Sequence, residues 1–504
     1  MFMFGYNLGV INAPQSVIVG FIKDVDRARK NITNSTDELL LSDSTVDFIW
    51  AVVVSIFAVG GMIGGAVGGW LSEAVGRKGG LLLNTWIAII GAILMWCSFT
   101  ASSYEMIIIG RFIIGVSCGV STILSPMYVS EIAPVDRRGG LGVFNQLAVT
   151  FGLLVGQVLG LDGLLGDEWP TLLGIILIPP ALQFVCLFFC CESPRFLLLQ
   201  RHSREKARRA LVGLRGVIQV EPEIDEILKE HSELASHHRE EPSFLDFLTK
   251  TWLRRPIVIA VVMQLSQQLN GILAIFYYST DIFLSAGMSE SVATGATCGV
   301  GLVMVVMTLV SVPLIETRGR KSLHLFGLVG MFVLSILITI SLSVEGTSAN
   351  IFSVIVVLGY VVFFAIGPGS IPWLITAELF SQTARAKAMA IAVAFNWGSN
   401  FLAGISFPFI QDYLKQLVFL PFTALLFLFA AFTYSQVPET KGKTVQEIAA
   451  LFRATPGGVP SHSADTPPEG NDRASPPDYG TTSAPSEDGG ETSDKADLEA
   501  NAKY

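Results

Sequence analysis

The chain has 504 residues, of which 51% are hydrophobic and only 15% are charged. A soluble protein of this length carries about 25% charged residues, so the composition excludes a soluble globular class and predicts a polytopic membrane protein. The net charge of −9 comes mostly from an acidic C-terminal tail. It therefore indicates no nucleic-acid partner, and the partner that the composition implies is the lipid bilayer.

Twelve apolar runs follow one another along the chain and predict an all-α membrane protein. They lie near residues 1–22, 48–71, 80–101, 105–128, 140–161, 170–191, 256–286, 291–315, 322–343, 349–376, 387–410 and 416–436. We expect no cleavable signal peptide. The six cysteines lie in or beside these runs, which is not the pattern of a disulfide framework.

The first polar loop carries two N-glycosylation sequons, at Asn31 and Asn34. A sequon is used only on the lumenal or external side of a membrane. With both termini in the cytoplasm, only five of the 33 basic residues face outward, which satisfies the positive-inside rule. These five are Lys23, Arg27, Arg29, Lys30 and Lys415. We expect a plasma-membrane protein with both termini cytoplasmic.

Residues 192–255 form the one long loop between predicted spans, and residues 204–216 and 222–235 have the pattern of amphipathic helices. We expect a helical collar on the cytoplasmic side. After about residue 455 the chain is rich in Pro, Ser, Gly, Asp and Glu with few large apolar residues, a composition typical of disorder.

Charged signatures recur between the two halves of the chain, which indicates an internal repeat. They pair Glu73 with Glu316, 243 residues apart, and Glu131 with Glu378 and Glu192 with Glu439, each 247 residues apart. The spacing predicts six-helix bundles at 1–191 and 256–436, separated by the loop 192–255 and followed by a cytoplasmic tail at 437–504. Two parallel halves with a midplane site between them are the architecture of major facilitator transporters.

Gln264, Gln267 and Gln268 lie on one helical face of an apolar run. Polar side chains inside a membrane are costly, so they usually mark a functional site. Uncharged carboxamides, which donate and accept hydrogen bonds, suit a neutral polyhydroxy solute better than an ion. The alternative is that the glutamines only join helices to one another.

Several motifs together make the chain similar to the facilitative glucose transporters, sugar porters of the major facilitator superfamily, over residues 4 to about 453. The motifs include Phe4-Gly5-Tyr6-Asn7, Gly76-Arg77-Lys78, Gly110-Arg111-Phe112, Glu192-Ser193-Pro194-Arg195, Gln264-Leu265-Ser266-Gln267-Gln268, Gly367-Pro368-Gly369 and Pro438-Glu439-Thr440-Lys441-Gly442. The Gln264-Leu265-Ser266 triplet resembles the glucose-preferring members. The resemblance implies uniport of a hexose, D-glucose first of all, by alternating access.

Residue chemistry and the resemblance together give a candidate substrate site of neutral amides and indole rings. Its members are Gln146, Gln267, Gln268, Asn270, Trp373, Asn396, Trp397 and Asn400. Gln157 is expected to face the same cavity. Core packing is the alternative for the two tryptophans. Gly367-Pro368-Gly369 should break the tenth span and form a gate, together with Tyr277 and Tyr278.

The resemblance also implies a cytoplasmic ion-pair network that holds that side closed when the cavity faces outward. Its candidate members are Glu73, Arg77, Glu131, Arg138, Arg195, Glu316, Arg320, Glu378, Arg385 and Glu439. Plain positive-inside topology is the other explanation for the arginines. The family usually has asparagines where Leu273 and Met304 stand and a glutamate where Ala365 stands, so the preferred hexose is left open.

Three other functions compete with sugar uniport. A proton symporter of this superfamily carries an aspartate where this chain has Asn7, and asparagine does not titrate. A non-transporting nutrient receptor stays open. An enzyme is not expected, because the glycine-rich run 60–69 lies within a span, as in close helix packing, and no nucleophile–base pair is evident. No cofactor and no metal site are expected.

Overall fold

The computed structural model describes residues 1–30, 41–134, 138–161, 163–166, 168–236, 242–285, 287–344 and 347–443, with residues 447, 448 and 452. Residues 1–454 form one compact unit. The two sequons and the tail from residue 455 lie outside the described residues, as does the side chain of Arg138.

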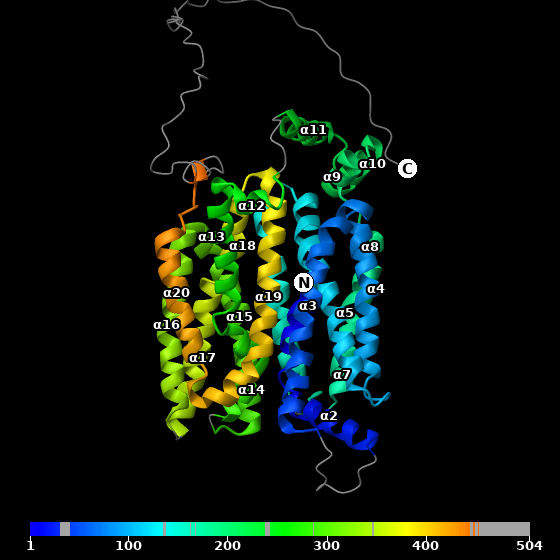
Figure 1. Cartoon of the computed structure of the whole chain (residues 1–504). Helices are drawn as coiled ribbons and strands as arrows, with labels where there is room; N and C mark the ends of the chain where they lie inside the picture. The colour runs from blue at the N-terminus through cyan, green and yellow to red at the C-terminus, as the bar shows by residue number, and fades with distance from the viewer. Residues whose placement is uncertain are drawn as a thin grey trace, which may run out of the picture. The chain divides into compact units, whose positions relative to one another are not determined.

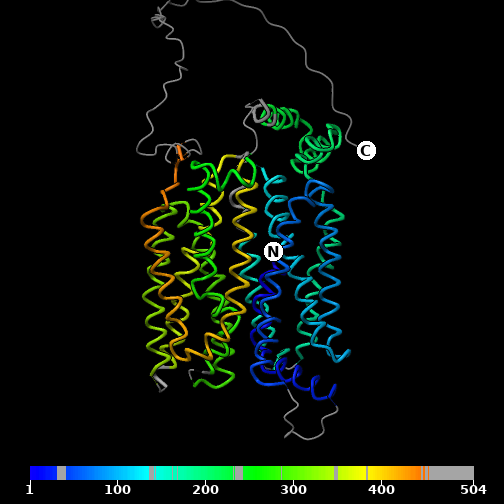
Figure 2. The backbone as a smooth tube through the Cα atoms, viewed as in Figure 1, coloured from blue at the N-terminus to red at the C-terminus, as the bar shows by residue number. Residues whose placement is uncertain are grey.

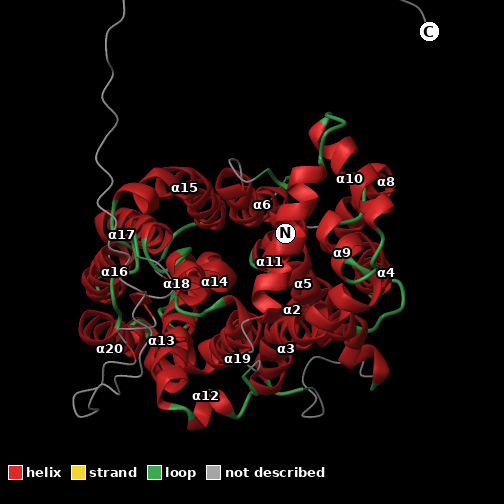
Figure 3. Ribbon diagram, turned by 90° about the horizontal axis from the view of Figure 1, so that it is seen from above, coloured by secondary structure: helices red, strands yellow, loops and turns green. Residues whose placement is uncertain are grey.

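Within the described ranges every regular element is a helix, as the apolar pattern predicted (Figures 1 and 3). The N-terminal helices are α1 (Phe2–Gly9), α2 (Gln15–Arg29), α3 (Asp43–Val75), α4 (Arg77–Cys97), α5 (Tyr104–Ile132), α6 (Arg138–Leu159), α7 (Trp169–Gly174), η2 (Ile175–Leu177) and α8 (Ile178–Phe189).

The second half of the chain supplies a further set of long helices. The C-terminal helices are α13 (Thr251–Gln268), α14 (Ile272–Ser285), α15 (Glu290–Thr317), α16 (Arg320–Leu342), α17 (Thr347–Ile366), α18 (Ile371–Glu378), α19 (Gln382–Leu414), η3 (Lys415–Leu417) and α20 (Leu420–Gln436).

Between these two sets, the described residues of 192–250 form a collar of short helices. They are α9 (Pro194–Leu199), α10 (Arg204–Arg215), α11 (Glu221–Ser236) and α12 (Asp246–Thr249). The collar lies at one end of the long helices, here called the collar end (Figure 2). Helix α2 and the turn between α14 and α15 lie at the other end, here called the far end (Figure 1).

Nine helical segments in the described part of the chain are long and apolar enough to cross a membrane, and two shorter apolar helices, Phe144–Leu159 and Leu420–Gln436, accompany them. The predicted first span is divided: α1 ends at Gly9, residues 10–14 form turns, and α2 begins at Gln15. With α1, these segments correspond one to one with the twelve predicted spans, and the predicted all-α membrane fold is confirmed.

Glycines let the N-terminal helices approach one another closely. An added Cβ on Gly60 would lie 2.1 Å from the Phe112 carbonyl oxygen, and one on Gly64 would lie 2.1 Å from that of Val116. Because no side chain fits there, α3 and α5 pack backbone to backbone, as small residues allow in membranes. The glycine-rich run therefore serves helix packing, as its spacing predicted.

The N-terminal and C-terminal helices meet along three pairs: α3 with α19, α6 with α15 and α1 with α14. At the far end Asn12 joins α1 to α14, because its Nδ2 donates to the Phe276 carbonyl at 3.0 Å and to Ser279 Oγ at 2.8 Å. Its Oδ1 accepts the Thr280 N–H at 3.3 Å. The two sets of helices are thus held together at the far end.

Candidate functional site

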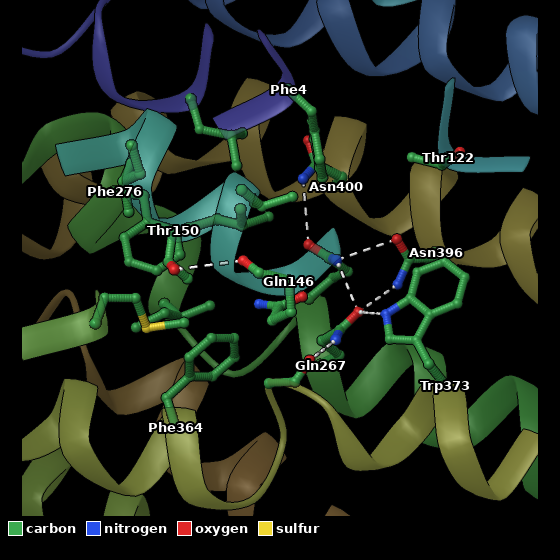
Figure 4. A pocket seen from close by; sticks show the side chains of 18 of the residues that line it. Phe4, Thr122, Gln146, Thr150, Gln267, Phe276, Phe364, Trp373, Asn396 and Asn400 are labelled. Carbon is green, nitrogen blue, oxygen red and sulfur yellow. Dashed lines mark hydrogen bonds between the residues drawn. The ribbon is translucent and has the colours of Figure 1, made fainter. Parts of the chain in front are cut away.

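A pocket lies between the N-terminal and C-terminal helices and contains most of the predicted substrate residues (Figure 4). Residues of both sets of helices line it, and concave sites between helices of a bundle commonly bind small molecules. Its polar lining comprises Thr122, Gln146, Thr150, Gln267, Gln268, Trp373, Asn396 and Asn400, and its apolar lining includes Phe4, Leu8, Leu273, Phe276, Met304, Phe364 and Trp397.

Gln267 is the centre of a hydrogen-bonded group of side chains on one wall (Figure 4). Its Nε2 donates to the Gly369 carbonyl at 2.6 Å. Its Oε1 accepts from Asn396 Nδ2 at 2.7 Å and from Trp373 Nε1 at 3.1 Å. A residue from α13 is thereby tied to α18, α19 and the break after α17.

Gln268 extends this group along the wall. Its Nε2 donates to Asn396 Oδ1 at 3.1 Å, and its Oε1 accepts from Asn400 Nδ2 at 3.2 Å. The amides therefore satisfy one another in a chain that crosses from α13 to α19. We call Gln267, Gln268, Asn396 and Asn400 the amide group.

The local backbone explains why Gln267 and Gln268 reach the pocket. They occupy the last turn of α13, and the chain then turns at Gly271, where φ is +92°. Only glycine adopts that conformation without strain. A Cβ there would also lie 3.1 Å from the Phe422 ring and 3.2 Å from the Tyr360 hydroxyl, so the break is fixed by packing as well.

Asn270, predicted to bind substrate, does not line the pocket. It is fully buried, its Nδ2 donates to the Ser266 carbonyl at 2.8 Å, and its Oδ1 accepts the Ile272 N–H at 3.0 Å. Both amide atoms are therefore used in the turn between α13 and α14. The prediction is corrected: Asn270 is a structural residue of the break.

Gln146 projects from α6 toward the amide group across the pocket (Figure 4). Gln157, about three turns further along the same helix, is 1% exposed but is not among the lining residues. Its amide nitrogen and oxygen have no hydrogen-bond partner. The expectation that it faces the cavity is therefore wrong, because it packs against Gly301 of α15.

Gln264, the first of the three glutamines, is also fully buried and outside the lining. Its Oε1 accepts from Asn396 Nδ2 at 2.8 Å, and its Nε2 approaches Thr376 Oγ1 at 3.4 Å. Thus one glutamine joins helices, while the two that follow face the pocket.

The two tryptophans have different surroundings. Trp373 is partly exposed to the pocket and bonds to Gln267. Trp397 is only 2% exposed and lies with its ring centroid 5.2 Å from that of Phe4 and 5.8 Å from that of Phe57. Trp397 therefore packs α19 against α1 and α3 and presents only an edge to the pocket.

The predicted gate residues are buried beside the pocket. The Tyr277 hydroxyl donates to Asn400 Oδ1 at 3.2 Å, and that of Tyr278 donates to the Gly404 carbonyl at 3.2 Å. Helix α14 departs from helical geometry at Tyr278, where φ is −134° and ψ is 17°. The residues Gly367 to Gly369 break the predicted tenth span into α17 and α18, as the Gly-Pro-Gly pattern predicted.

Two ion pairs of the predicted network are present at the collar end. Arg77 Nη2 lies 2.8 Å from Glu131 Oε1, and Glu131 also accepts a hydrogen bond from the Ser193 hydroxyl. In the second half, Arg320 Nη2 lies 3.3 Å from Glu378 Oε1. Each pair joins helices within its own half of the chain.

Glu192 was missed as a site residue, although its counterpart in the repeat, Glu439, was included. Glu192 Oε1 accepts the backbone N–H of Arg77 at 2.9 Å and that of Lys78 at 3.0 Å. Glu439 Oε1 likewise accepts the Arg320 N–H at 2.8 Å. Both carboxylates cap a helix N-terminus, where negative charge is stabilised, and the 247-residue spacing was the signal for it.

Four further predicted members whose side chains are described make no ion pair with these residues. Arg195 pairs with Glu230 of the collar at 2.6 Å, and Arg385 donates to the Phe380 carbonyl at 3.3 Å. Glu73 and Glu316 are exposed, and no ion pair of theirs is seen among the described residues. Arg195, Glu73 and Glu316 are therefore not part of the network in this conformation.

No described residue that lines the pocket has an ionisable carboxylate, amine, guanidinium or imidazole side chain. Asn7 is fully buried outside the lining, and its Nδ2 donates to the Met3 carbonyl at 2.9 Å. The nearby Arg111 is also fully buried and donates to the carbonyls of Asn7 and Val53 at 2.9 Å and 3.1 Å. The described lining is thus uncharged, and its polar side chains stand among many apolar ones.

Comparison with known proteins relates this geometry to transporters. A family model described as "Sugar (and other) transporter" matches residues 1–452. The chain is 45% identical over 458 residues to solute carrier family 2, facilitated glucose transporter member 4 from Homo sapiens, covering 90% of this chain and 88% of that protein. It is 44% identical over 470 residues to facilitated glucose transporter member 1 from Gallus gallus, covering 92% and 93%.

Solved structures also resemble it. The partially occluded inward-open xylose transporter XylE from E. coli has a TM-score of 0.72 at 27% identity, covering 88% of this chain and 96% of that one. The proton:xylose symporter XylE bound to 6-bromo-6-deoxy-D-glucose has a TM-score of 0.71 at 29% identity, covering 90% and 96%.

Proposed function

The chain belongs to the sugar transporter family, and we propose that it carries a hexose, D-glucose first of all, down its concentration gradient across a membrane. The observation that carries the proposal is the uncharged polar pocket. Its carboxamides both donate and accept hydrogen bonds, as sugar hydroxyls do. An ionic solute would need an opposite charge, which the described lining does not contain.

In this proposal the substrate site consists of Gln146, Gln267, Gln268, Trp373, Asn396, Trp397 and Asn400, which line one pocket. The amides hold hydroxyl groups, and the indole of Trp373 lies against the C–H face of the pyranose. Trp397 contributes less, since its exposed fraction is 2%. Asn270 is left out because its amide is used in the backbone turn.

The transport is uniport. The relative XylE is described as a proton:xylose symporter, so coupling to protons is the second candidate. Proton coupling needs a group in the pocket region that binds and releases a proton as the cavity changes sides. The amide of Asn7 cannot do so, and the described lining has no carboxylate.

Alternating access follows from two six-helix bundles, 1–191 and 256–436, which rock about the pocket. The helix breaks at Gly271 and at Gly367 to Gly369, and the buried Tyr277 and Tyr278, supply the parts of the C-terminal bundle that move. Support comes from the contacts of the far end, where Asn12 bonds to α14 and so joins the two halves. This arrangement fits a carrier whose cavity opens toward the collar.

The chain is an integral membrane protein. We place the collar end and both termini in the cytoplasm and the loop with Asn31 and Asn34 outside, at the plasma membrane. The charge distribution supports this orientation, because few of the basic residues precede or follow the spans at the far end.

Counterflow of radiolabelled hexoses into proteoliposomes tests the function, with and without a pH gradient. D-glucose should exchange in both conditions at the same steady-state level. Accumulation driven by the pH gradient would overturn uniport, and a lack of exchange with every hexose would overturn sugar transport.

A further inference from the structure

The polar and apolar groups of the pocket come from different C-terminal elements. Helices α13, α18 and α19 supply the amide group and Trp373, whereas α14, α15 and α17 supply only apolar side chains. These are Ile272, Leu273, Phe276, Met304 and Phe364, here called the apolar wall. Phe276 and Phe364 lie on the side of the pocket away from Trp373 and Asn396 (Figure 4).

None of the described side chains of the apolar wall is polar, and the nearest amide in sequence cannot easily turn toward the pocket. Leu273 and Met304 are each 3% exposed, and Phe276 and Phe364 are each 5% exposed, so they are packed in place. The amide nearest in sequence, Asn270, is held by Ser266 and Ile272 and cannot turn toward the pocket without losing both bonds. A hydroxyl placed against this wall therefore finds no hydrogen-bond partner on it.

A hexopyranose carries hydroxyls around its whole rim. When the amide group binds one edge, the hydroxyls of the opposite edge face the apolar wall, except where Gln146 and Thr150 of α6 reach them from the N-terminal half. A hydroxyl that leaves water without a new partner loses about fivefold or more in affinity. Hydrogen or a small alkyl group at the same carbon suits the wall better, because apolar surface leaves water there.

We propose that this site prefers hexoses that lack a free hydroxyl on one edge, that is, deoxyhexoses or their O-alkyl ethers, over the fully hydroxylated sugar. The inference rests on the proposed function, since it concerns the substrate class of the same pocket. The apolar wall is the specificity determinant, and Leu273 of α14 and Met304 of α15 contribute to it from two different helices.

The test uses the unaltered protein in proteoliposomes and measures how the monodeoxy-D-glucoses and the matching O-methyl ethers inhibit D-glucose counterflow. We expect the analogues altered at one or two neighbouring carbons to bind about fivefold more tightly than D-glucose. The analogues altered at carbons that face the amide group should bind at least about fivefold more weakly. Weaker binding of every analogue would overturn the preference, with D-glucose exchange intact.

Two variants check the role of the wall. Leu273→Asn adds an amide and should reverse the preference, so that D-glucose binds more tightly than the favoured analogue, while Leu273→Met keeps the wall apolar and should keep the preference. An unchanged preference in a folded Leu273→Asn protein would overturn the assignment to this wall. If the variant fails to fold, the analogue series on the unaltered protein decides. Absence of exchange with every hexose, by contrast, overturns the proposed function itself.

Discussion

Gln268 and Asn270 stand two positions apart in the chain but have different surroundings. Gln268 lines the pocket and bonds to side chains of α19, whereas the side-chain amide of Asn270 bonds within its own turn. Residue type alone does not separate them, since both are carboxamides in one polar stretch. The sequence could predict that a cluster of amides lies in this stretch. It could not predict which of these amides would bond to backbone groups instead of lining the pocket.

Substitution of the two residues should therefore have separate effects. Gln268→Ala should raise the half-saturating hexose concentration about fivefold or more, because a sugar hydroxyl loses its partner, with little change in the melting temperature. Asn270→Ala should lower the free energy of unfolding by about 1–3 kcal/mol and leave the half-saturating concentration of the folded fraction unchanged. Thermal unfolding in detergent and counterflow kinetics measure both. The opposite pattern would contradict the assignment.

Other residues were predicted well because their chemistry is rare in a membrane. Asn396 and Asn400 share a helix face in the sequence and do meet Gln267 and Gln268. The repeat pairs Glu192 with Glu439 but does not show that a carboxylate at this position caps a helix, since that depends on tertiary contact with α4. In the structure, Arg195 pairs with Glu230 of the collar, and Glu192 accepts a backbone hydrogen bond at the start of α4.

At the scale of helices, the contact of α6 with α15 determines how closely the two sets of helices approach. An added Cβ on Gly301 would lie 2.2 Å from Gln157 Oε1 and 3.0 Å from the Leu154 Cα. On Gly299, on the same helix, the nearest atom is Leu358 Cδ2 at 3.6 Å, an ordinary contact. The two glycines thus provide a variant and its control.

Gly301→Ala should favour the conformation that is open at the far end, because Gln157 must move aside and the added methyl group then presses on the α6 backbone at Leu154. Gly299→Ala should not. A cysteine introduced at Ser279, which is 1% exposed, reports the opening in a protein without native cysteines. Maleimide should modify it several times faster in Gly301→Ala than in Gly299→Ala. Equal rates would refute a spacing role for this contact.

A second close contact holds the break after α17. An added Cβ on Gly327 of α16 would lie 2.7 Å from Pro368 Cδ and 2.8 Å from the Gly367 Cα. These backbone and ring atoms cannot move aside cheaply. Gly327→Ala should therefore destabilise the protein by about 1–3 kcal/mol, measured by thermal unfolding. Gly295→Ala, with open space around its Cβ, is the control and should leave the melting temperature unchanged.

Helical periodicity and apolar length could predict each of these segments, and the Gly-Pro-Gly motif predicted the break after α17, but two other irregularities were not predictable. The division of the first span at residues 10–14 and the irregular Tyr278 in α14 depend on tertiary contacts. Asn12 is an example, since its amide bonds to Phe276 and Ser279 of α14, which lie 264 and 267 residues away in sequence.

For the molecule as a whole, the repeat of charged residues was enough to pair distant segments of the chain. The repeat could not show whether the cavity opens at the collar end or at the far end, because ion pairs within each half can form in both conformations. Conformation depends on contacts between the halves, such as those of Asn12, which no spacing in the sequence reveals.

Glu378→Ala should shift the protein toward the inward-facing conformation. The Arg320–Glu378 pair joins α16 to the end of α18, and the loss of its carboxylate loosens the collar end, which must close when the cavity faces outward. A cysteine probe at the far end should then react more slowly than in the unaltered protein. Glu316→Ala, which removes an exposed carboxylate, is the control. Unchanged labelling in Glu378→Ala would rule the role out.

The amide group has a consequence for the speed of the cycle. Its members already bond to one another at 2.7–3.2 Å. A sugar that binds must therefore replace hydrogen bonds between these amides with hydrogen bonds to its own hydroxyls. The net free energy gained per hydrogen bond is small for that reason. A sugar bound with such a small net gain dissociates soon after the cavity opens to the other side of the membrane. The protein is therefore suited to rapid turnover of an abundant nutrient and poorly suited to scavenging a scarce one.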